Sequence, residues 1–402
     1  MHILLIHQAF ASLDEPGGTR HHELARHLAD LGHRVSIIAS PVSYLTGVGQ
    51  TQSLLVEDKN GRILIYRTYT YPALHKSFFH RLISFFSFMF SSFFKALTIQ
   101  DVDLVWGTTP PIFQSVTAWL VARLKDVPFM LEVRDLWPEF AIAVGVLKNP
   151  LLIKLSFWLE KFLYRHADSI VVNSPGFVAH VLDKGGKNIE IVPNGADISQ
   201  IELISRVEAR KTMGWPDKYI VLYAGAHGMS NDLEVVLEAA QVLSAKSDIV
   251  FYFLGDGKEK SRLIEKANSM KLANVKFLSP VSKNEINHSL SAADACVAIL
   301  KPVEMYKTTY PNKVFDYMAA GKPIILAIDG VIRGVVESAG CGVFCQPGDS
   351  HKLADAVMFL YNNQEKAEQM GLNGRDYLEK NFDRKIIADK LAGLMVKMVR
   401  NG

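Results

Sequence analysis

Short apolar runs alternate with longer amphipathic stretches along the whole chain. The runs are rich in β-branched and aromatic residues and uninterrupted, which is typical of strands covered on both faces. In the first half they occupy residues 3–6, 34–40, 62–67, 103–107, 129–133, 169–174 and 189–193. In the second half they occupy residues 219–225, 249–255, 275–279, 295–301, 323–329 and 342–347. This alternation predicts an α/β protein with two doubly wound parallel sheets and helices on both faces of each.

A more polar stretch separates the two series of runs. It follows Asn194 and Gly195, and the apolar pattern restarts at Tyr219. A single core seldom grows beyond about 250–300 residues, so a chain of this length is expected to divide. The pattern therefore predicts one domain over residues 1–195 and a second over residues 218–382.

The most specific stretch of the chain is residues 310–323, which read YPNKVFDYMAAGKP between two apolar runs. Asn312, preceded by a proline, favours the start of a helix, and Gly321 favours its end. The first turn of such a helix lies at the carboxyl ends of the strands, where open α/β sheets bind ligands. Lys313 and Asp316 are three residues apart and project from one side. A cation there could meet a phosphate, and a carboxylate could accept both hydroxyls of a ribose.

This stretch resembles the donor-binding signature of the retaining glycosyltransferases of family four. In that family a Glu-x7-Glu element runs into a helix of the type K-(L/V/I)-F-E-Y-M-A-A-G-K-P, and the match here covers residues 311–323. This chain departs from the signature at both glutamate positions. It has Thr308 in place of the first Glu and Asp316 in place of the second. The chain resembles the bacterial O-antigen and capsule transferases that act on nucleotide-activated N-acetylated deoxysugars of the N-acetylfucosamine type, and these often lack the first Glu.

The resemblance implies the GT-B fold, in which two Rossmann-like domains face each other across a cleft. The first domain binds the acceptor and the second binds the nucleotide sugar. The last helix of that fold returns to the first domain, which would be the place of residues 383–402 here. The resemblance also implies that Asn312, Lys313 and Asp316 bind the donor.

A glycine pair precedes the first predicted helix. Gly17 and Gly18 would let the backbone approach a ligand closely and point bare N–H groups at an anion. In the family this turn faces the diphosphate of the donor, although a glycine pair in a turn is often purely structural. The loop is not of the G-x-G-x-x-G type, so it does not predict a dinucleotide cofactor.

The run at residues 129–133 continues into RDLWPE, a second point of resemblance to these transferases. Arg134 and Asp135 follow the strand directly, at its functional end. We interpret Arg134 as a clamp for a phosphate or the acceptor and Asp135 as a partner of sugar hydroxyls. Glu139 is a candidate contact to the acceptor. The alternative is a structural Arg–Asp pair.

The loop that opens the second domain departs from the family. Where the family often has an arginine and a later lysine to hold the diphosphate, this chain has Ala226 or His227 and no nearby lysine. We therefore expect phosphate to be bound by the backbone of Gly228 and by Asn231, aided by Lys313.

Composition excludes several classes of function. The 44 basic residues exceed the 41 acidic ones by only three, so no nucleic-acid partner is predicted.

The D-x-D pair Asp101 and Asp103 lies at the amino end of a strand, away from the expected site, and no metal site is predicted. His21, His22 and His27 lack metal-ligand spacing and are expected at the surface or the edge of the cleft. Apart from the nucleotide sugar we expect no cofactor.

A helix near residues 76–97 carries many aromatic residues. Eight phenylalanines fall between Phe78 and Phe94, and the charge-free run from Leu82 is 13 residues, short of the ~20 that span a bilayer. One helical stripe is polar and consists of His80, Ser84, Ser87, Ser91 and Lys95. The helix is either buried with these serines against the domain or exposed to a membrane. We favour the membrane, because residues 59–100 hold six Lys or Arg and no acid.

The predicted reaction is the transfer of a sugar, with retention, from a nucleoside diphosphate sugar, expected to be UDP-linked. The expected acceptor is a saccharide on polyprenyl diphosphate in O-antigen or capsule synthesis. Lys313, Arg134 and Asp135 are the candidate catalytic residues. The enzyme would be cytoplasmic and peripheral on the inner face of the plasma membrane, with its oligomeric state left open. The alternatives are a nucleotide-sugar 2-epimerase of the same fold and a non-catalytic sugar-nucleotide-binding protein.

Overall fold

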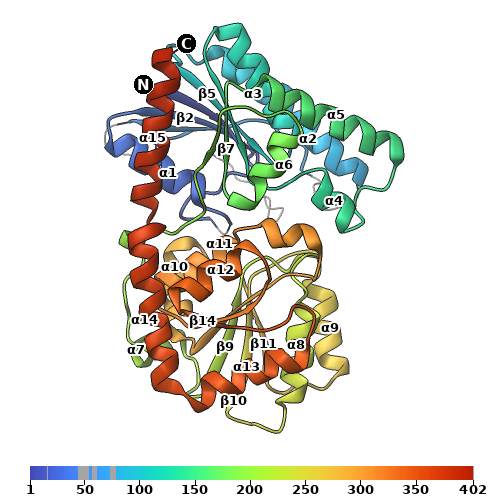
Figure 1. The fold of residues 1–402 in the computed structure, drawn as a ribbon, viewed down its shortest axis with the longest axis vertical. Helices are drawn as coiled ribbons and strands as arrows, with labels where there is room; N and C mark the ends of the chain where they lie inside the picture. Colours follow the sequence, from blue (N-terminus) through green and yellow to red (C-terminus); the bar gives the residue numbers. More distant parts are fainter. Residues whose placement is uncertain (16, 44–53, 57–60, 73–77, 402) are drawn as a thin grey trace. The chain divides into compact units, whose positions relative to one another are not determined.

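The computed structural model describes residues 1–401 except residues 16, 44–53, 57–60 and 73–77. The chain forms two compact units (Figure 1). The first contains Met1–Ser12, Gly18–Pro193 and Lys385–Gly402, and the second contains Leu13–Gly17 and Asn194–Arg384. Each unit is a sheet of mainly parallel strands covered by helices, which confirms the predicted fold class.

The first unit has an eight-stranded sheet in the order β3-β4-β2-β1-β5-β6-β7-β8. The strands are β1 (His2–Ile6), β2 (Arg34–Ala39), β3 (Leu54–Val56), β4 (Ile63–Arg67), β5 (Leu104–Thr109), β6 (Phe129–Val133), β7 (Ser169–Val172) and β8 (Ile189–Ile191). The edge strand β3 runs antiparallel to β4, whereas the other pairs are parallel. The apolar pattern missed β3, because a strand of three residues leaves too short a run to be detected.

The helices of the first unit are α1 (Arg20–Asp30), α2 (Phe78–Thr98), α3 (Phe113–Lys125), α4 (Glu139–Ala143), α5 (Pro150–His166), α6 (Val178–Asp183) and α15 (Arg384–Asn401). Figure 1 shows α1 and α15 on one side of this sheet and α2, α3 and α5 on the other. Leu391 and Met395 of α15 are buried in one core with Leu28 of α1 and with Val35 and Ile37 of β2. The last helix of the chain therefore completes the core of the first unit.

The aromatic helix α2 begins at Phe78, so the first two residues of the predicted helix near 76–97 lie outside the described part of the chain. Its buried stripe consists of Ser84, Phe88, Ser92 and Ala96. Its exposed large side chains are Phe79, Ile83, Phe86, Phe90, Phe94 and Leu97. Of the serines that the buried alternative places against the domain, only Ser84 is fully buried. Ser87 and Ser91 lie at the border of the buried stripe, because Phe88 takes the central position against the sheet.

The second unit has a six-stranded parallel sheet in the order β11-β10-β9-β12-β13-β14. Its strands are β9 (Tyr219–Ala224), β10 (Ile249–Leu254), β11 (Val275–Leu278), β12 (Ala295–Ile299), β13 (Ile324–Ala327) and β14 (Gly342–Phe344). Its helices are α7 (Arg206–Met213), α8 (Leu233–Val242), α9 (Lys260–Ser269), α10 (Lys283–Ala292), α11 (Asn312–Ala319), α12 (Val331–Ala339), α13 (Ser350–Asn362) and α14 (Gln364–Asn381). Ile220 and Leu222 enter one core while Val221 and Tyr223 enter the other, which explains why the run is apolar throughout.

The strand order reverses once within each unit. In the second sheet the chain passes from β9 outward to β11 and then returns to place β12 on the other side of β9. In the first sheet β1 lies between β2 and β5 in the same way. The loops that follow the strands on either side of such a reversal separate and leave room for a ligand. Ligand-binding residues are therefore expected after β9 and β12, and after β1 and β5.

Candidate functional site

Lys313 stands at the reversal point of the second sheet. It belongs to the first turn of α11, which follows β12, and its Nζ donates to the hydroxyl of Tyr223 at 2.7 Å and to Oδ1 of Asn231 at 3.1 Å. Tyr223 is the second-last residue of β9, and its own hydroxyl donates to the carbonyl oxygen of Ala226. Burial lowers the pKa of Lys313 to about 7. The ammonium can therefore gain or lose its proton near neutral pH, and an anion nearby would favour the charged form.

The loop after β9 carries the expected phosphate ligands. Gly228 lies in this loop, and a Cβ added to it would stand 3.4 Å from Nδ2 of Asn231. Since Asn231 also accepts from Lys313, the structure brings these three predicted donor-binding residues together. Two conditions for an anion site are met here, a positive charge and a loop that leads into the N-terminus of α8.

Glycines let the loops after β9 and β10 pack backbone against backbone. A Cβ on Gly255 would lie 2.0 Å from the carbonyl oxygen of Gly225, and one on Gly257 would lie 2.5 Å from that of His227. Both glycines have positive φ, +142° and +153°, which other residues rarely adopt.

His227 does not replace the missing arginine of the family. It is completely buried, and neither ring nitrogen has a hydrogen-bond partner among the described residues. Its ring lies near those of Tyr223, Phe253 and Phe277. Burial, reinforced by the charges of Lys260 and Lys313, lowers the pKa of His227 to about 4. The imidazole is therefore neutral at neutral pH and contributes no cation.

Asp316 and Asn312 lie on the same helix as Lys313. Oδ1 of Asp316 accepts from Nζ of Lys283, at the start of α10, at 2.5 Å. Oδ1 of Asn312 is buried and has no hydrogen-bond partner among the described residues. Thr308, at the position of the family's first Glu, donates its hydroxyl to the carbonyl oxygen of Met305. The sequence did not single out Lys283, because nothing local marks a partner 33 residues away from Asp316.

Arg134 follows β6, and its side chain contacts residues of β5 and of the loop after β1, at the reversal point of the first sheet. Its Nη2 donates to Nε2 of His7, which follows β1, at 3.1 Å, and its Nε donates to Oγ1 of Thr108 at 2.9 Å. Burial, together with His21 and Arg134, lowers the pKa of His7 well below its usual value, so the imidazole is neutral. Burial also raises the pKa of the adjacent Asp135 to about 6, although Arg134 opposes this. His7 was not predicted as a site residue, but its place directly after the first strand could have identified it.

Glu132 of β6 anchors a buried network beneath Arg134. It accepts from Nε of Arg20 at 2.9 Å, Nε2 of His21 at 2.6 Å and Nε1 of Trp106 at 3.2 Å. Burial opposes ionisation, but the charges of His21 and Arg20 hold the pKa of Glu132 below its usual value. The prediction that His21 and His22 lie at the surface or the cleft edge is wrong, since both are buried. A buried carboxylate needs hydrogen-bond donors, and Arg20 and His21 of α1 supply them to Glu132.

Glu139 is engaged by other side chains of the first unit. Its carboxylate lies 3.0 Å from Nδ1 of His180 and 3.6 Å from Nζ of Lys184, while Nε2 of His180 bonds Glu160 at 2.7 Å. Both ring nitrogens thus face carboxylates, and these raise the pKa of His180 to about 9 despite its partial burial. Glu139 thus belongs to an ion-pair cluster that joins α4, α5 and α6, and its contact with the acceptor stays a prediction.

The glycine pair of the first loop falls at the division of the chain, with Gly17 grouped in the second unit and Gly18 in the first. Gly17 has a φ of +150°, which favours glycine. A Cβ on Gly18 would meet no atom within 4 Å. The backbone conformation therefore favours glycine at position 17, whereas local packing does not require it at position 18.

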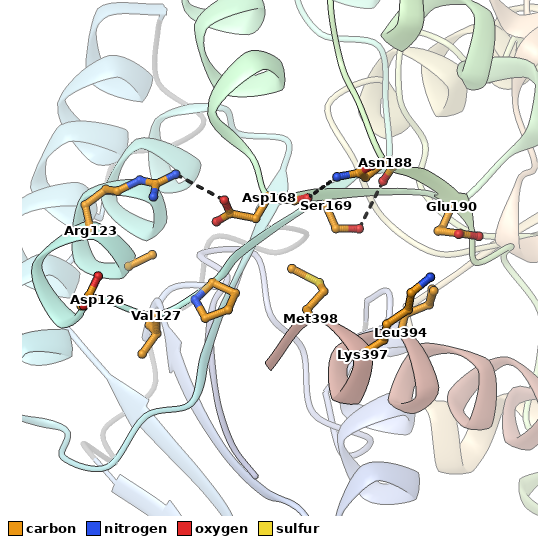
Figure 2. Close-up of a pocket in the computed structure, with 12 residues that line it drawn as sticks. Arg123, Asp126, Val127, Asp168, Ser169, Asn188, Glu190, Leu394, Lys397 and Met398 are labelled. Carbon is orange, nitrogen blue, oxygen red and sulfur yellow. Dashed lines mark hydrogen bonds and ion pairs between the residues drawn. The ribbon is translucent and has the colours of Figure 1, made fainter. Parts of the chain in front are cut away.

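A cavity of about 500 Å³ lies at the opposite edge of the first sheet (Figure 2). It is lined by residues that precede β6, β7 and β8, among them Pro128, Asp168 and Asn188, and by Lys397 and Met398 of α15. These positions are the amino ends of the strands, whereas Arg134 and His7 stand at the carboxyl ends. This cavity is therefore separate from the predicted site.

Among the described residues, no group of three or more His, Cys, Asp or Glu side chains is placed so that it could hold a metal ion. None of the described helices combines the length and the apolar character needed to cross a membrane.

Family models match both units of the chain. The Glycosyl transferase 4-like domain matches residues 17–195, and the model of Glycosyl transferases group 1 matches residues 205–377. A protein of Escherichia coli K12 assigned to colanic acid biosynthesis as the glycosyl transferase WcaI is 25% identical over 320 residues, 76% of this chain and 78% of that protein. The glycosyltransferase assigned as WbjE of Pseudomonas aeruginosa is 25% identical over 297 residues, 72% of this chain and 73% of that protein.

Solved structures show the same fold at low sequence identity. Sucrose-phosphate synthase from Thermosynechococcus elongatus has a TM-score of 0.82 at 18% identity, with both chains covered fully. Anabaena HepE, solved with UDP-glucose, has a TM-score of 0.74 at 16% identity and covers 99% of this chain and 100% of its own. From the two domain matches and the two Rossmann-like sheets, the chain is a glycosyltransferase of the GT-B fold and of the family-four type.

Proposed function

We propose that this glycosyltransferase moves an N-acetylated hexosamine or deoxyhexosamine, with retention, from a UDP-sugar to a saccharide carried on polyprenyl diphosphate. The observation that carries the proposal is the grouping of Lys313, Asn231 and Gly228 at the reversal point of the second sheet, with Asp316 on the same helix. A cation and bare amides suit a diphosphate, and a carboxylate suits a ribose.

Related proteins support the choice of substrates. One relative is assigned to colanic acid biosynthesis, and another, from Escherichia coli, is the O-antigen chain mannosyltransferase C, which is 23% identical over 263 residues. Both names place sugar transfer in the synthesis of surface polysaccharides. The structural neighbour HepE was solved with UDP-glucose and with UDP, which supports a uridine nucleotide as the donor.

In the proposed reaction the bond between the anomeric carbon and the diphosphate oxygen breaks, and the acceptor oxygen forms the new bond on the same face. The proton of the acceptor hydroxyl passes to the leaving phosphate oxygen, so no carboxylate base is needed. Negative charge grows on the leaving diphosphate, and the charged form of Lys313 stabilises it there. Arg134 and Asp135 of the first unit serve the acceptor, with Arg134 oriented by His7 and Thr108.

The proposed acceptor is linked to a lipid. The first unit has an apolar surface that could bind the membrane in which this lipid lies. The helices α2, α3 and α5 cover one side of the first sheet. Their exposed apolar side chains include Phe86, Phe90 and Phe94 of α2, Leu120 and Leu124 of α3, and Leu151, Leu155 and Trp158 of α5. We call these eight residues the apolar face.

The three helices that carry the apolar face have an excess of basic residues. The sequences of α2, α3 and α5 contain seven Lys or Arg and a single acid, Glu160, which is buried. Exposed aromatic side chains on helices with an excess of Lys and Arg suit an anionic lipid leaflet. The enzyme would therefore dock peripherally on the cytoplasmic leaflet, where a polyprenyl-linked acceptor resides.

The experiment is incubation of the purified protein with a panel of labelled nucleotide sugars and a bacterial membrane extract. Transfer predicts that label enters an organic-soluble lipid fraction and that UDP is released. A new free nucleotide sugar without lipid label would indicate an epimerase instead. Binding of UDP-sugars without any conversion would contradict the proposal and leave a non-catalytic binding protein.

A further inference from the structure

The ion pair between Lys283 and Asp316 lies where the proposed function places the ribose of the donor. Lys283 is the first residue of α10, and Nζ stands 2.5 Å from Oδ1 of Asp316 on α11. Only 11% of the lysine side chain and 28% of the aspartate side chain are exposed. The pair therefore differs from a flexible surface pair, and its geometry is held by the surrounding elements.

The start of α10 is fixed on both sides of Lys283. Ser282 and Glu285 form a reciprocal cap, in which the backbone N–H of Ser282 donates to the carboxylate of Glu285 at 3.0 Å. The backbone N–H of Lys283 donates to the carbonyl oxygen of Leu13 at 3.2 Å. A lysine anchored at a rigid helix start loses less freedom when it forms an ion pair, so the contact with Asp316 belongs to the ordered structure.

The pair leaves the two oxygens of Asp316 in different situations. Oδ1 accepts from the ammonium of Lys283, whereas Oδ2 accepts no hydrogen bond from the described residues. A lone carboxylate that accepts from both hydroxyls of a ribose discriminates against deoxyribose. When one hydroxyl is missing, one carboxylate oxygen is desolvated and has no hydrogen-bond donor. Here Lys283 already pairs one oxygen. Loss of one hydroxyl from the sugar therefore leaves no unpaired charge.

We propose that Lys283 sets the sugar specificity of the nucleotide site, and that the site accepts nucleoside diphosphates of both ribose and 2′-deoxyribose. One hydroxyl donates to Oδ2 of Asp316, and a second hydroxyl is not required. This inference rests on the proposed nucleoside diphosphate donor. It extends the donor class beyond ribonucleotides.

The test compares UDP with 2′-deoxy-UDP by calorimetry, so that the base is constant. Wild-type protein should bind the two within about threefold of each other. The variant Lys283→Met should bind UDP at least tenfold more tightly than 2′-deoxy-UDP, because the freed oxygen then needs the second hydroxyl. The control Lys246→Met, at an exposed lysine of the same unit, should behave as wild type. Thermal unfolding of each variant shows that it is folded.

The outcomes separate this inference from the proposed function. Binding of both nucleotides with no change of their ratio in Lys283→Met would overturn the role of Lys283 alone. Wild-type discrimination of tenfold or more would also overturn it. If wild-type protein binds neither nucleotide, the proposed function and this inference both fail.

Discussion

The ammonium nitrogen of Lys313 lies 2.7 Å from the phenolic oxygen of Tyr223 and 4.1 Å from the centre of its ring. The two residues are 90 positions apart and come from α11 and β9, on the two sides of the reversal point of the second sheet. The ring and its hydroxyl hold a cation that burial would otherwise disfavour. This contact prepares a positive charge at the place where the leaving diphosphate is expected, and three of the predictions that follow depend on this site.

The first prediction concerns catalysis by Lys313. The variant Lys313→Ala should lower kcat by roughly 100-fold or more, which is the usual effect of removing one preorganised group that stabilises growing charge. Steady-state kinetics with saturating donor and acceptor would measure it. Lys307→Ala serves as the control, because Lys307 is an exposed lysine that pairs only with Glu304 among the ion pairs of the described residues. A rise in KM with kcat unchanged would contradict a role in the transition state.

The second prediction concerns pH. Burial lowers the pKa of Lys313 in the free protein to about 7. A base with this pKa is charged below pH 7 and loses its proton as the pH rises, so kcat/KM should fall above about pH 7. The variant Lys313→Arg should keep its charge across the range, and its profile should lose this alkaline decline even if its activity is lower. A wild-type profile that stays flat from pH 6 to 9 would show that the charge of Lys313 is not required.

The third prediction concerns the donor affinity supplied by Asp316. The variant Asp316→Ala should weaken binding of UDP by ~1–3 kcal/mol, the cost of one charge-assisted hydrogen-bonding site. Isothermal calorimetry of UDP binding would measure the change, and circular dichroism would verify folding. An unchanged Kd would remove Asp316 from the site.

The fourth prediction concerns the cluster of His180, Glu139 and Glu160. The two carboxylates raise the pKa of His180 to about 9 in the folded protein, above the usual value of 6.5. A raised pKa contributes stability that is fully present below pH 6.5 and is lost as the pH rises toward 9. The free energy of unfolding should therefore fall by about 1–3 kcal/mol over this range. Urea unfolding at several pH values would show the fall in wild type and a flatter curve in His180→Gln. Equal slopes in both proteins would exclude the cluster as the cause.

The fifth prediction concerns membrane docking by the apolar face. Wild-type protein should float with anionic liposomes, and a variant with Phe86, Phe90 and Phe94 changed to Ser should stay in solution, because the exposed aromatic surface of α2 is lost. The control changes Val207 and Leu372, two exposed apolar residues of the second unit, to Ser and should still float. Flotation of the folded triple variant like wild type would show that α2 does not bind the lipid.

Local patterns in the sequence determined the two sheets and the helix of the donor signature. The strands of the second unit could be predicted because alternate residues of a buried parallel strand enter two cores, which leaves an uninterrupted apolar run, as in β9. The helix from Asn312 to Ala319 could be predicted because its start and end depend on the residues beside it. The short edge strand β3 could not, since three residues carry little pattern.

Only the tertiary structure decided which side chains meet. Lys313 meets Tyr223, Asp316 meets Lys283, and Arg134 meets His7, although these partners lie 90, 33 and 127 residues apart. Such contacts depend on where the crossover connections of a sheet place its loops. A local sequence pattern does not predict the positions of these loops. The same reason explains why the sequence did not show that Glu139 pairs with His180 and Lys184. A polar side chain near a site binds whichever partner the fold brings within reach, and the free energy of that contact is decided by burial and distance.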